Sequence, residues 1–357
     1  MKKVVLCTPT LLGGGAERFV VDLAIELNKD KNYEIIVAET RISVESFLKQ
    51  RLIDSGVRIV ELSANSYIEM TKKQLIFLKK EKPDVIHANI GSMFHIMLAC
   101  WILKIPKRIY TVHNEAKLLY GKNKLKKFIY KKAFSFFKFI PVAICPTVKD
   151  TIVKDMGINE KSIQVVNNGI DIERFQPNFF KKSEDELKII SVGSFYWIKN
   201  QKMMIEAVYN LKNSGKNVSL TLLGDGEDRL SIEKLILDLK AEKYIFVPGI
   251  KKDVEKYLKD SDIYISASKT EGLPLSILEG MACGLPVVTT MAGGVKDIVS
   301  HKKNGFLVPI DDEEEFEKFI SELLENKQER EVFGRESRKI AEQWSLQNCV
   351  EGYKKIY

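Results

Sequence analysis

Cysteine and histidine are both scarce in this sequence, which has five of the first and four of the second among its 357 residues. The cysteines are scattered and none form a Cys-x-x-Cys pair; they are Cys7, Cys100, Cys145, Cys283 and Cys349. An odd, dispersed set of cysteines argues against a disulfide framework and against a zinc site. It fits a reduced, cytoplasmic location.

Long hydrophobic runs are missing as well. The most apolar stretch, 94–103, is ten residues long and contains His95, whereas a membrane-spanning helix needs about 20 residues. The first apolar run ends at Cys7 and is followed by Pro9, so it is too short for a signal peptide. With 45% hydrophobic and 29% charged residues, the composition is that of a globular protein, and the length suggests two domains.

Positive charge is concentrated in the first half of the chain. Residues 1–178 contain 29 Lys and Arg against 18 Asp and Glu, whereas residues 179–357 contain 27 against 30. The net charge of +8 therefore comes from the first half. This imbalance suggests that the first half meets an anionic partner.

Short segments rich in Val and Ile alternate with helix-length segments in both halves. The alternation predicts an α/β fold of two doubly wound (Rossmann-like) domains that face a ligand-binding cleft. Strands are expected at 4–7, 34–38, 57–60, 84–87 and 108–112, and again at 188–192, 219–223, 245–247, 263–265 and 286–289.

The domain boundary is expected in the polar stretch 176–186, since few contacts cross such linkers. This gives an N-terminal domain, 1–178, and a C-terminal domain, 179–343. The last helix, 344–357, is expected to pack back on the N-terminal domain.

Two helix starts could bind an anion. Gly13, Gly14 and Gly15 precede a helix and would let a phosphate approach the backbone, although a plain strand-to-helix turn explains the same residues. The second start is at Pro274, a residue that suits the first helical position. Free backbone N–H groups at Leu275 would then face a phosphate.

Two carboxylates flank this second helix start. Glu271 precedes the turn that contains Ser276, and Glu279 lies about one and a half turns into the helix. The pair could hold the hydroxyl groups of two sugars. Spacing alone also fits two ordinary surface acids.

Glu271 and Glu279 form a Glu-x7-Glu pattern that resembles the signature of retaining glycosyltransferases of family 4, which have the GT-B fold. Further blocks resemble the same family in the same order: Gly14-Gly15-Ala16-Glu17-Arg18, Asn168-Gly169-Ile170-Asp171, Gly284-Leu285-Pro286-Val287-Val288 and Gly293-Gly294. The resemblance extends over essentially the full chain.

The resemblance implies an enzyme that moves a hexosyl or N-acetylhexosaminyl group from a nucleotide-diphosphate donor, expected to be a UDP-sugar, to a lipid-linked or polysaccharide acceptor. It belongs to the type that builds bacterial surface glycans, with the acceptor on the N-terminal domain. The resemblance implies that Glu279 binds the ribose hydroxyls and that Glu271 contacts the transferred sugar near its anomeric centre. Gly14 and Gly15 approach the diphosphate, and Leu275 and Ser276 start the phosphate-binding helix.

The family usually places an Arg directly after the glycine at position 193 and a Lys a few residues later. Here the first position is Ser194, which leaves Lys199 to neutralise the diphosphate, with Asn200 beside it in the donor site. No metal ion and no other cofactor is expected, because the lysine and the helix dipole take the place of a cation. Asp225 is interpreted as part of a turn rather than as a metal ligand.

Two histidines end predicted strands. In the family, a histidine at the position of His113 approaches the transferred sugar; a satisfied buried histidine is the alternative. For His87 a role in the cleft and a role in the core also both stay open.

Residues 117–138 contain eight lysines and no acidic residue. Apolar residues recur there at helical spacing: Leu125, Phe128, Ile129, Ala133, Phe136, Phe137 and Ile140. One interpretation is that this stripe packs on the first sheet and the lysines are solvated. The other is that the helix lies on an anionic membrane surface, at the inner face of the cell membrane, or contacts a lipid-diphosphate acceptor.

Two other functions stay open. A sugar-nucleotide epimerase on the same fold would convert the donor without any acceptor. A non-catalytic protein could use the basic half to bind a membrane or nucleic acid, but the sequence has no RNA-binding motif with interleaved aromatic residues, so no nucleic-acid partner is expected.

Overall fold

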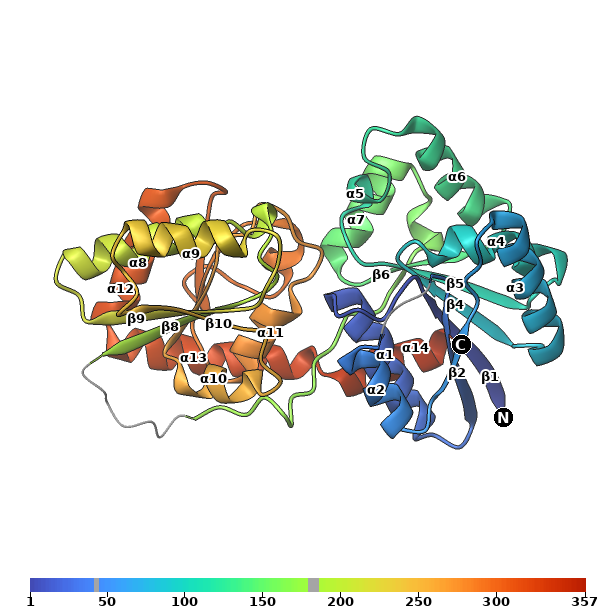
Figure 1. Ribbon diagram of the computed structural model, residues 1–357, viewed down its shortest axis with the longest axis horizontal. Helices are drawn as coiled ribbons and strands as arrows, with labels where there is room; N and C mark the ends of the chain where they lie inside the picture. The colour runs from blue at the N-terminus through green and yellow to red at the C-terminus, as the bar shows by residue number, and fades with distance from the viewer. Residues whose placement is uncertain (42–44, 179–185) are drawn as a thin grey trace. The chain divides into compact units, whose positions relative to one another are not determined.

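The computed structural model describes residues 1–41, 45–178 and 186–357. These residues form two units, each with its own sheet (Figure 1). Unit 1 comprises Met1–Gly169 together with Leu346–Tyr357, and unit 2 comprises Ile170–Ser345.

Unit 1 is built on a parallel sheet with the strand order β3-β2-β1-β4-β5-β6-β7. Its strands are β1 (Lys2–Thr8), β2 (Tyr33–Glu39), β3 (Arg58–Glu61), β4 (Val85–Asn89), β5 (Lys107–Val112), β6 (Ile140–Ala143) and β7 (Gln164–Val165). Its helices are α1 (Gly15–Asn28), α2 (Phe47–Asp54), α3 (Tyr67–Glu81), α4 (Ser92–Ile102), α5 (Ala116–Tyr120), α6 (Lys124–Ser135), α7 (Pro146–Met156) and α14 (Leu346–Ile356), with a 3₁₀ turn at η1 (Glu160–Ser162).

Unit 2 repeats this plan with the order β10-β9-β8-β11-β12-β13. Its strands are β8 (Leu187–Val192), β9 (Val218–Leu223), β10 (Ile245–Gly249), β11 (Ile263–Ser266), β12 (Val287–Thr290) and β13 (Gly305–Val308). Its helices are α8 (Gln201–Asn213), α9 (Arg229–Asp238), α10 (Val254–Asp260), α11 (Leu275–Ala282), α12 (Glu313–Glu325) and α13 (Lys327–Gln343), with 3₁₀ turns at η2 (Trp197–Lys199) and η3 (Gly293–Asp297).

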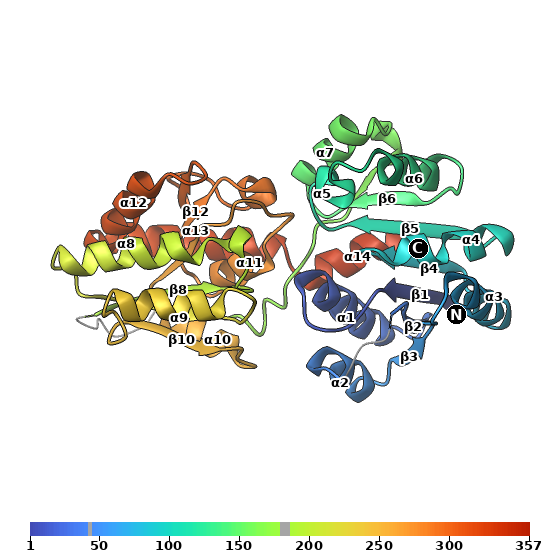
Figure 2. The ribbon, with the colours of Figure 1, turned by 45° about the horizontal axis from the view of Figure 1, so that its top comes forward.

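Helices cover both faces of each sheet, which is why the strands are apolar on both sides. In unit 1, α2 and α14 pack against α1, whereas α3 packs against α4 (Figure 2). In unit 2, α9 and α12 pack against α8, whereas α10 and α13 pack against α11. The predicted α/β fold with two doubly wound sheets is therefore confirmed.

In each sheet the strand order reverses direction at one point, and ligands of such sheets bind beyond the carboxyl ends of the strands there. The reversal lies between β1 and β4 in unit 1 and between β8 and β11 in unit 2. We therefore expect a ligand-binding site in the loops that follow these four strands.

The boundary between the units differs from the predicted one at 178/179. Residues 170–175 pack with unit 2, because Phe175 is fully buried and its carbonyl oxygen accepts a hydrogen bond of 2.7 Å from Arg338 Nη1. The unit boundary thus falls at Gly169, and part of the expected linker, 179–185, lies outside the described residues.

At the other end of the chain, the helix expected at 344–357 begins at Leu346. This helix, α14, belongs to unit 1. Its Tyr353 is fully buried, and the Tyr353 hydroxyl lies 2.8 Å from Thr111 Oγ1 on β5.

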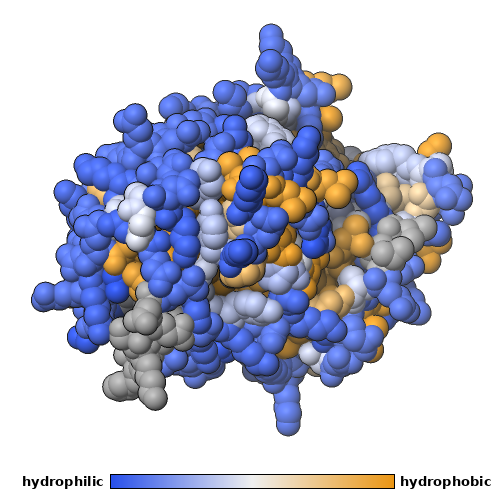
Figure 3. Space-filling model, turned by 60° about the vertical axis from the view of Figure 1, so that its left-hand side comes forward, coloured by the Kyte–Doolittle hydropathy of each residue, from blue (hydrophilic) through white to orange (hydrophobic). Residues whose placement is uncertain are grey.

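The surface drawn in Figure 3 is mostly hydrophilic and is interrupted by patches of hydrophobic side chains. Apolar atoms contribute much of the surface of any folded protein, so scattered patches need no special explanation. Among the helices in the described ranges, none combines the length and the hydropathy that crossing a bilayer requires.

Candidate functional site

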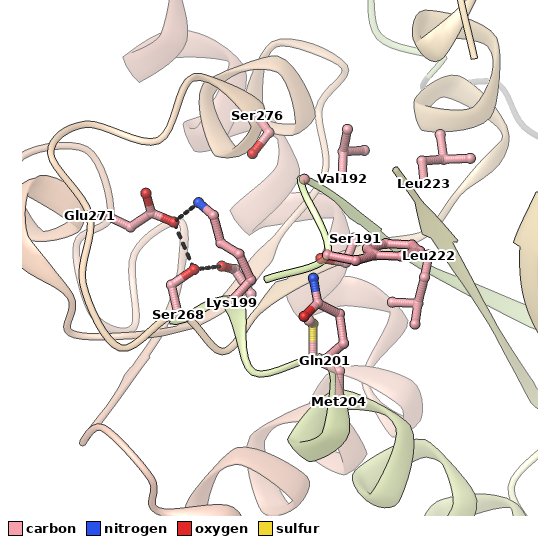
Figure 4. Close-up of a pocket in the computed structure, with 13 residues that line it drawn as sticks. Ser191, Val192, Lys199, Gln201, Met204, Leu222, Leu223, Ser268, Glu271 and Ser276 are labelled. Atoms are coloured by element: carbon pink, nitrogen blue, oxygen red, sulfur yellow. Dashed lines mark hydrogen bonds and ion pairs between the residues drawn. The ribbon is translucent and has the colours of Figure 1, made fainter. Parts of the chain in front are cut away.

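A pocket lies at the carboxyl ends of β8 and β11, where the strand order of unit 2 reverses (Figure 4). Its wall is formed by Ser191, Val192, Gly193, Phe195, Lys199, Gln201, Met204, Leu222, Leu223, Ser266, Ser268, Glu271 and Ser276. Three of the residues that the sequence predicted for the donor site, Lys199, Glu271 and Ser276, are therefore brought together in one place.

An ion pair forms the polar side of this pocket. Lys199 Nζ lies 2.5 Å from Glu271 Oε1, and the Ser268 hydroxyl donates to the same oxygen at 2.7 Å. The side chains are 24% exposed for Lys199 and 11% exposed for Glu271. An ammonium group has three donors, so Lys199 can hold Glu271 and still bind an anion in the pocket.

Helix α11 begins beside this ion pair. It starts at Leu275, one residue after the predicted start, because Pro274 has an extended backbone (φ −77°, ψ 100°) and acts as the N-cap. The N–H groups of the first turn have no partner within a helix, and together with the helix dipole they favour an anion. Ser276, on this first turn, lines the pocket.

Glu279 lies on α11 and is only 2% exposed. The alternative that the two carboxylates are ordinary surface acids is therefore wrong, since Glu271 is also largely covered. Burying a carboxylate is costly unless it binds something. Neither Glu279 nor Leu275 is among the residues that line the pocket.

A glycine lets α11 approach the sheet closely. A Cβ atom on Gly280 would lie 2.6 Å from Cδ2 of Tyr264, a residue of β11. The Tyr264 hydroxyl donates to the carbonyl of Val192 at 3.2 Å, at the end of β8. Burial raises the pKa of Tyr264, so this hydroxyl keeps its proton. Tyr264 thus contacts α11 through Gly280 and the end of β8 through Val192. These two contacts hold α11 against the strand that precedes the loop with Lys199.

The loop after β9 supports the loop after β8. Phe195 N donates to Asp225 O at 2.9 Å, and a Cβ atom on Gly224 would lie 1.8 Å from the carbonyl oxygen of Gly193. The Asp225 carboxylate is paired with Arg229 at 2.8 Å. The interpretation of Asp225 as a turn residue is therefore confirmed, and its turn braces the loop that leads to Lys199.

Asn200 is not among the residues that line the pocket. Its backbone is left-handed (φ 50°), and its side-chain Nδ2 lies 3.3 Å from Asp311 Oδ1. The next residue, Gln201, lines the pocket instead and donates from Nε2 to Ser194 O at 2.9 Å. Sequence reasoning missed Gln201, and only its position at the start of a helix after Lys199 could have indicated it.

The glycine run of unit 1 lies at the start of α1, at the end of the loop that follows β1. The left-handed backbone occurs at Gly13 (φ 136°), whereas Gly14 is an extended N-cap (φ −71°). A Cβ atom on Gly15 would meet nothing within 4 Å, but one on Gly14 would lie 2.3 Å from the Glu17 carboxylate. Space for a ligand is therefore open at Gly15.

His113 follows β5 and is 9% exposed. Its Nε2 lies 2.9 Å from Asn89 Oδ1. The Asn89 amide nitrogen points at the carbonyls of Cys7 (3.4 Å) and His87 (3.3 Å), so its oxygen faces the histidine. Nε2 therefore carries the proton and Nδ1 is an acceptor. Burial lowers the pKa of His113 to about 3, so the ring is neutral at physiological pH.

Among the described residues, His113 Nδ1 is buried without a hydrogen-bond partner. A neutral hydrogen-bond acceptor of this kind can bind the hydroxyl group of a ligand. His87 differs, because its Nδ1 lies 2.6 Å from the Tyr357 hydroxyl and its Nε2 lies 2.6 Å from Thr111 Oγ1. The hypothesis of a cleft role for His87 is wrong: it is a satisfied core histidine that joins α14 to the sheet.

The two halves of the chain match two family models. Residues 13–174 match Glycosyltransferase Family 4, and residues 172–340 match Glycosyl transferases group 1. With two doubly wound sheets and a polar pocket at the switch point of the second, the chain belongs to the glycosyltransferases of the GT-B fold, as the family resemblance implied.

Proteins of similar sequence are also named as glycosyltransferases. An uncharacterized glycosyltransferase of Methanocaldococcus jannaschii is 27% identical over 96% of this chain and 94% of the relative. The UDP-Gal:alpha-D-GlcNAc-diphosphoundecaprenol alpha-1,3-galactosyltransferase of Escherichia coli is 29% identical over 76% of this chain and 75% of the relative. Among solved structures, an Anabaena protein in complex with UDP and glucose has a TM-score of 0.87 at 18% identity, with 99% of both chains covered.

Proposed function

We propose that this glycosyltransferase is a retaining enzyme that moves a hexosyl or N-acetylhexosaminyl group from a UDP-sugar to a lipid-linked or polysaccharide acceptor in bacterial surface-polysaccharide assembly. The proposal rests above all on the Lys199–Glu271 pair, which faces the start of α11 in the unit 2 pocket. The name of the Escherichia coli relative and the ligands of the Anabaena structure support the donor and the acceptor class.

In this proposal the donor diphosphate binds Lys199 and the N–H groups of the first turn of α11. Glu271 accepts hydrogen bonds from hydroxyls of the transferred sugar, and the buried Glu279 accepts them from the ribose. Carboxylates suit this task because each oxygen accepts more than one hydrogen bond. The start of α1 at Gly14 and Gly15 is a further proposed donor-binding position, as the family resemblance implies.

Negative charge grows on the leaving phosphate as the bond between it and the sugar breaks. Lys199 and the dipole of α11 stabilise that charge, which is the main electrostatic demand of the reaction. Retention follows if the acceptor hydroxyl attacks from the face that the diphosphate leaves, with the acceptor proton passing to a phosphate oxygen. In this scheme Lys199 and the dipole of α11 take the place of a divalent cation.

The acceptor substrate is assigned to unit 1. His113 is proposed to approach the transferred sugar, and its Nδ1, a neutral hydrogen-bond acceptor, can bind a sugar hydroxyl. The comparisons favour transfer over the epimerase and over a non-catalytic role, because the matching family models and relatives are those of glycosyltransferases.

Calorimetric titration with UDP tests the donor site. Glu279→Ala should weaken UDP binding about 10- to 100-fold, because hydrogen bonds to a charged group contribute about 1.5–3 kcal/mol. Glu325→Ala is the control, since Glu325 lies on α12 and pairs with Lys216, and neither residue lines the pocket. An unchanged UDP affinity for Glu279→Ala would rule out the proposed site.

Turnover measured in the presence of a chelator tests the metal-free scheme, and the anomeric configuration of the product tests retention. We expect full activity with the chelator and a linkage of the same anomeric configuration as the donor. Loss of turnover with the chelator, or an inverted linkage, would each overturn the corresponding part of the proposal.

A further inference from the structure

Helix α6 has two apolar faces, and only one of them is covered. The covered face includes Tyr130 and Ala133, which are buried, with the Tyr130 ring 4.7 Å from that of Phe94. Leu125 and Phe128 are 68% and 54% exposed. At 100° per residue they lie on the opposite side of the helix from Tyr130. The interpretation that the apolar stripe packs against the protein therefore holds for Ala133 but not for Leu125 and Phe128.

The exposed face continues onto α4. Phe136, the C-cap of α6, is 54% exposed, and Trp101 and Ile102 at the end of α4 are 45% and 48% exposed. The Trp101 and Phe136 rings are 5.7 Å apart. Large apolar side chains of two helices thus meet at the surface around Phe136, and a contiguous exposed patch of this kind marks an interaction site.

Lysines surround these apolar side chains. Lys124, Lys131 and Lys132 are exposed on α6, and Lys132 Nζ lies 5.4 Å from the centre of the Phe128 ring. The segment 117–138 holds eight lysines and no carboxylate, so nothing within it neutralises them. A helix with Phe and Leu between lysines on its solvent face has the composition of helices that lie in the interface of anionic bilayers.

We propose that the face formed by Trp101, Leu125, Phe128 and Phe136 with the lysines of α6 docks on an anionic lipid bilayer. Charge complementarity selects the lipid, because anionic headgroups attract lysines within a Debye length of the surface. The apolar side chains then enter the boundary between headgroups and acyl chains. The partner of this face is thus a lipid surface, which goes beyond the proposed transfer reaction and does not depend on it.

Co-sedimentation of the full chain with vesicles tests the charge contribution. Binding should be strong to vesicles of phosphatidylcholine with 30% phosphatidylglycerol, weak to phosphatidylcholine alone, and lower at high salt. The triple variant Lys124→Glu/Lys131→Glu/Lys132→Glu should lose about 100-fold or more in partitioning, since each lysine contributes about fivefold.

The matched control makes the same charge change at three exposed lysines of unit 2, as Lys234→Glu/Lys243→Glu/Lys256→Glu. It should bind within about twofold of the parent protein if docking is specific to the proposed face. Equal loss in both triple variants would show a non-specific attraction of the whole cationic chain and would overturn the proposal.

The apolar contribution is tested by Phe128→Ser/Phe136→Ser, which should lower partitioning about tenfold or more. The control Leu230→Ser/Leu237→Ser removes two side chains of α9 that are 81% and 58% exposed, and it should have no effect. Unchanged vesicle binding of the Phe128→Ser/Phe136→Ser variant would show that the face is only adsorbed electrostatically to the headgroups, and would overturn insertion into lipid.

Trp101 gives a direct readout of depth. In a Trp197→Phe background, which removes the other exposed tryptophan among the described residues, lipids brominated on the acyl chain should quench its fluorescence. Quenching should require phosphatidylglycerol in the vesicles. Binding without quenching would contradict the proposed insertion of this face.

Discussion

The two sheets end differently at their switch points, although their strand orders follow one plan. Unit 2 presents charge there, with Lys199 and Glu271 joined in a partly exposed ion pair. Unit 1 presents a buried, neutral pair, in which Asn89 holds the protonated Nε2 of His113. Equal topology therefore does not mean equal chemistry, since function depends on the residues placed at the strand ends.

The difference fits two ligands of different charge. A diphosphate needs a cation and a helix start, and these interactions strengthen in a pocket that excludes water. A sugar hydroxyl needs only a neutral acceptor whose protonation does not change near pH 7. Under the proposed function, unit 2 holds the charged part of the donor, and unit 1 contributes polar contacts without adding charge.

The largest expected effect concerns acid. Burial lowers the pKa of both His87 and His113 to about 3, from 6.5 in the unfolded chain. The unfolded chain binds more protons between these values, so stability falls as the pH falls through that window. Two such groups remove about 3 kcal/mol per pH unit, or about 5 kcal/mol between pH 6.5 and 4.5.

Hydrogen exchange, corrected for its intrinsic pH dependence, would show whether the loss is confined to unit 1. Unit 2 contains one histidine, the exposed His301, and its protection should change little over the same range. The variant His87→Gln should flatten the pH dependence of unit 1, even though it lowers the stability at pH 7. Equal losses in both units would contradict the contrast drawn here.

The second effect compares a glycine inside α11, Gly280, with a glycine at the start of α1, Gly15. Gly280→Ala places a Cβ atom 2.6 Å from the Tyr264 ring, so urea unfolding should show a loss of about 1–3 kcal/mol. Gly15→Ala meets nothing within 4 Å and should leave the unfolding free energy unchanged within about 0.5 kcal/mol. Gly15→Ala should nevertheless lower turnover if the diphosphate approaches that backbone. Equal stability loss in both variants would refute the distinction.

Much of the fold could be predicted from the sequence, because strands buried on both faces read as short apolar runs. Sequence analysis did not identify β6, β7 and β13, because their sequences resemble strands only weakly. β6 contains Pro141 and β13 begins at Gly305, two residue types that are unfavourable in strands. β7 has only two residues, Gln164 and Val165.

The site was predictable only where spacing carries the information. Glu271 and Glu279 are recognisable at a fixed interval, whereas Tyr264 acts through the carbonyl of Val192, 72 residues away along the chain. The two interpretations of α6 stayed open for a related reason: periodicity shows that Leu125 and Phe128 share a face but does not show which face the protein covers.

The smallest expected effect concerns Ser268, a residue that sequence analysis did not select. Its hydroxyl donates to Glu271 Oε1 at 2.7 Å, and its carbonyl accepts from the Thr290 hydroxyl at 2.5 Å. Ser268→Ala removes one neutral hydrogen-bond donor to Glu271, while the Lys199 ion pair remains. The affinity for the UDP-sugar should therefore fall about threefold to tenfold, the equivalent of about 0.5–1.5 kcal/mol. The control Ser261→Ala also removes a buried hydroxyl, which donates to Tyr257 O at 2.8 Å, but it should leave UDP-sugar binding unchanged.

If UDP alone binds Ser268→Ala normally and the UDP-sugar does not, Glu271 is oriented for the sugar. If the variant binds UDP and the UDP-sugar with equally reduced affinity, Ser268 acts through Lys199 on the diphosphate instead. That result would contradict the assignment of Glu271 to the sugar and of Lys199 to the diphosphate.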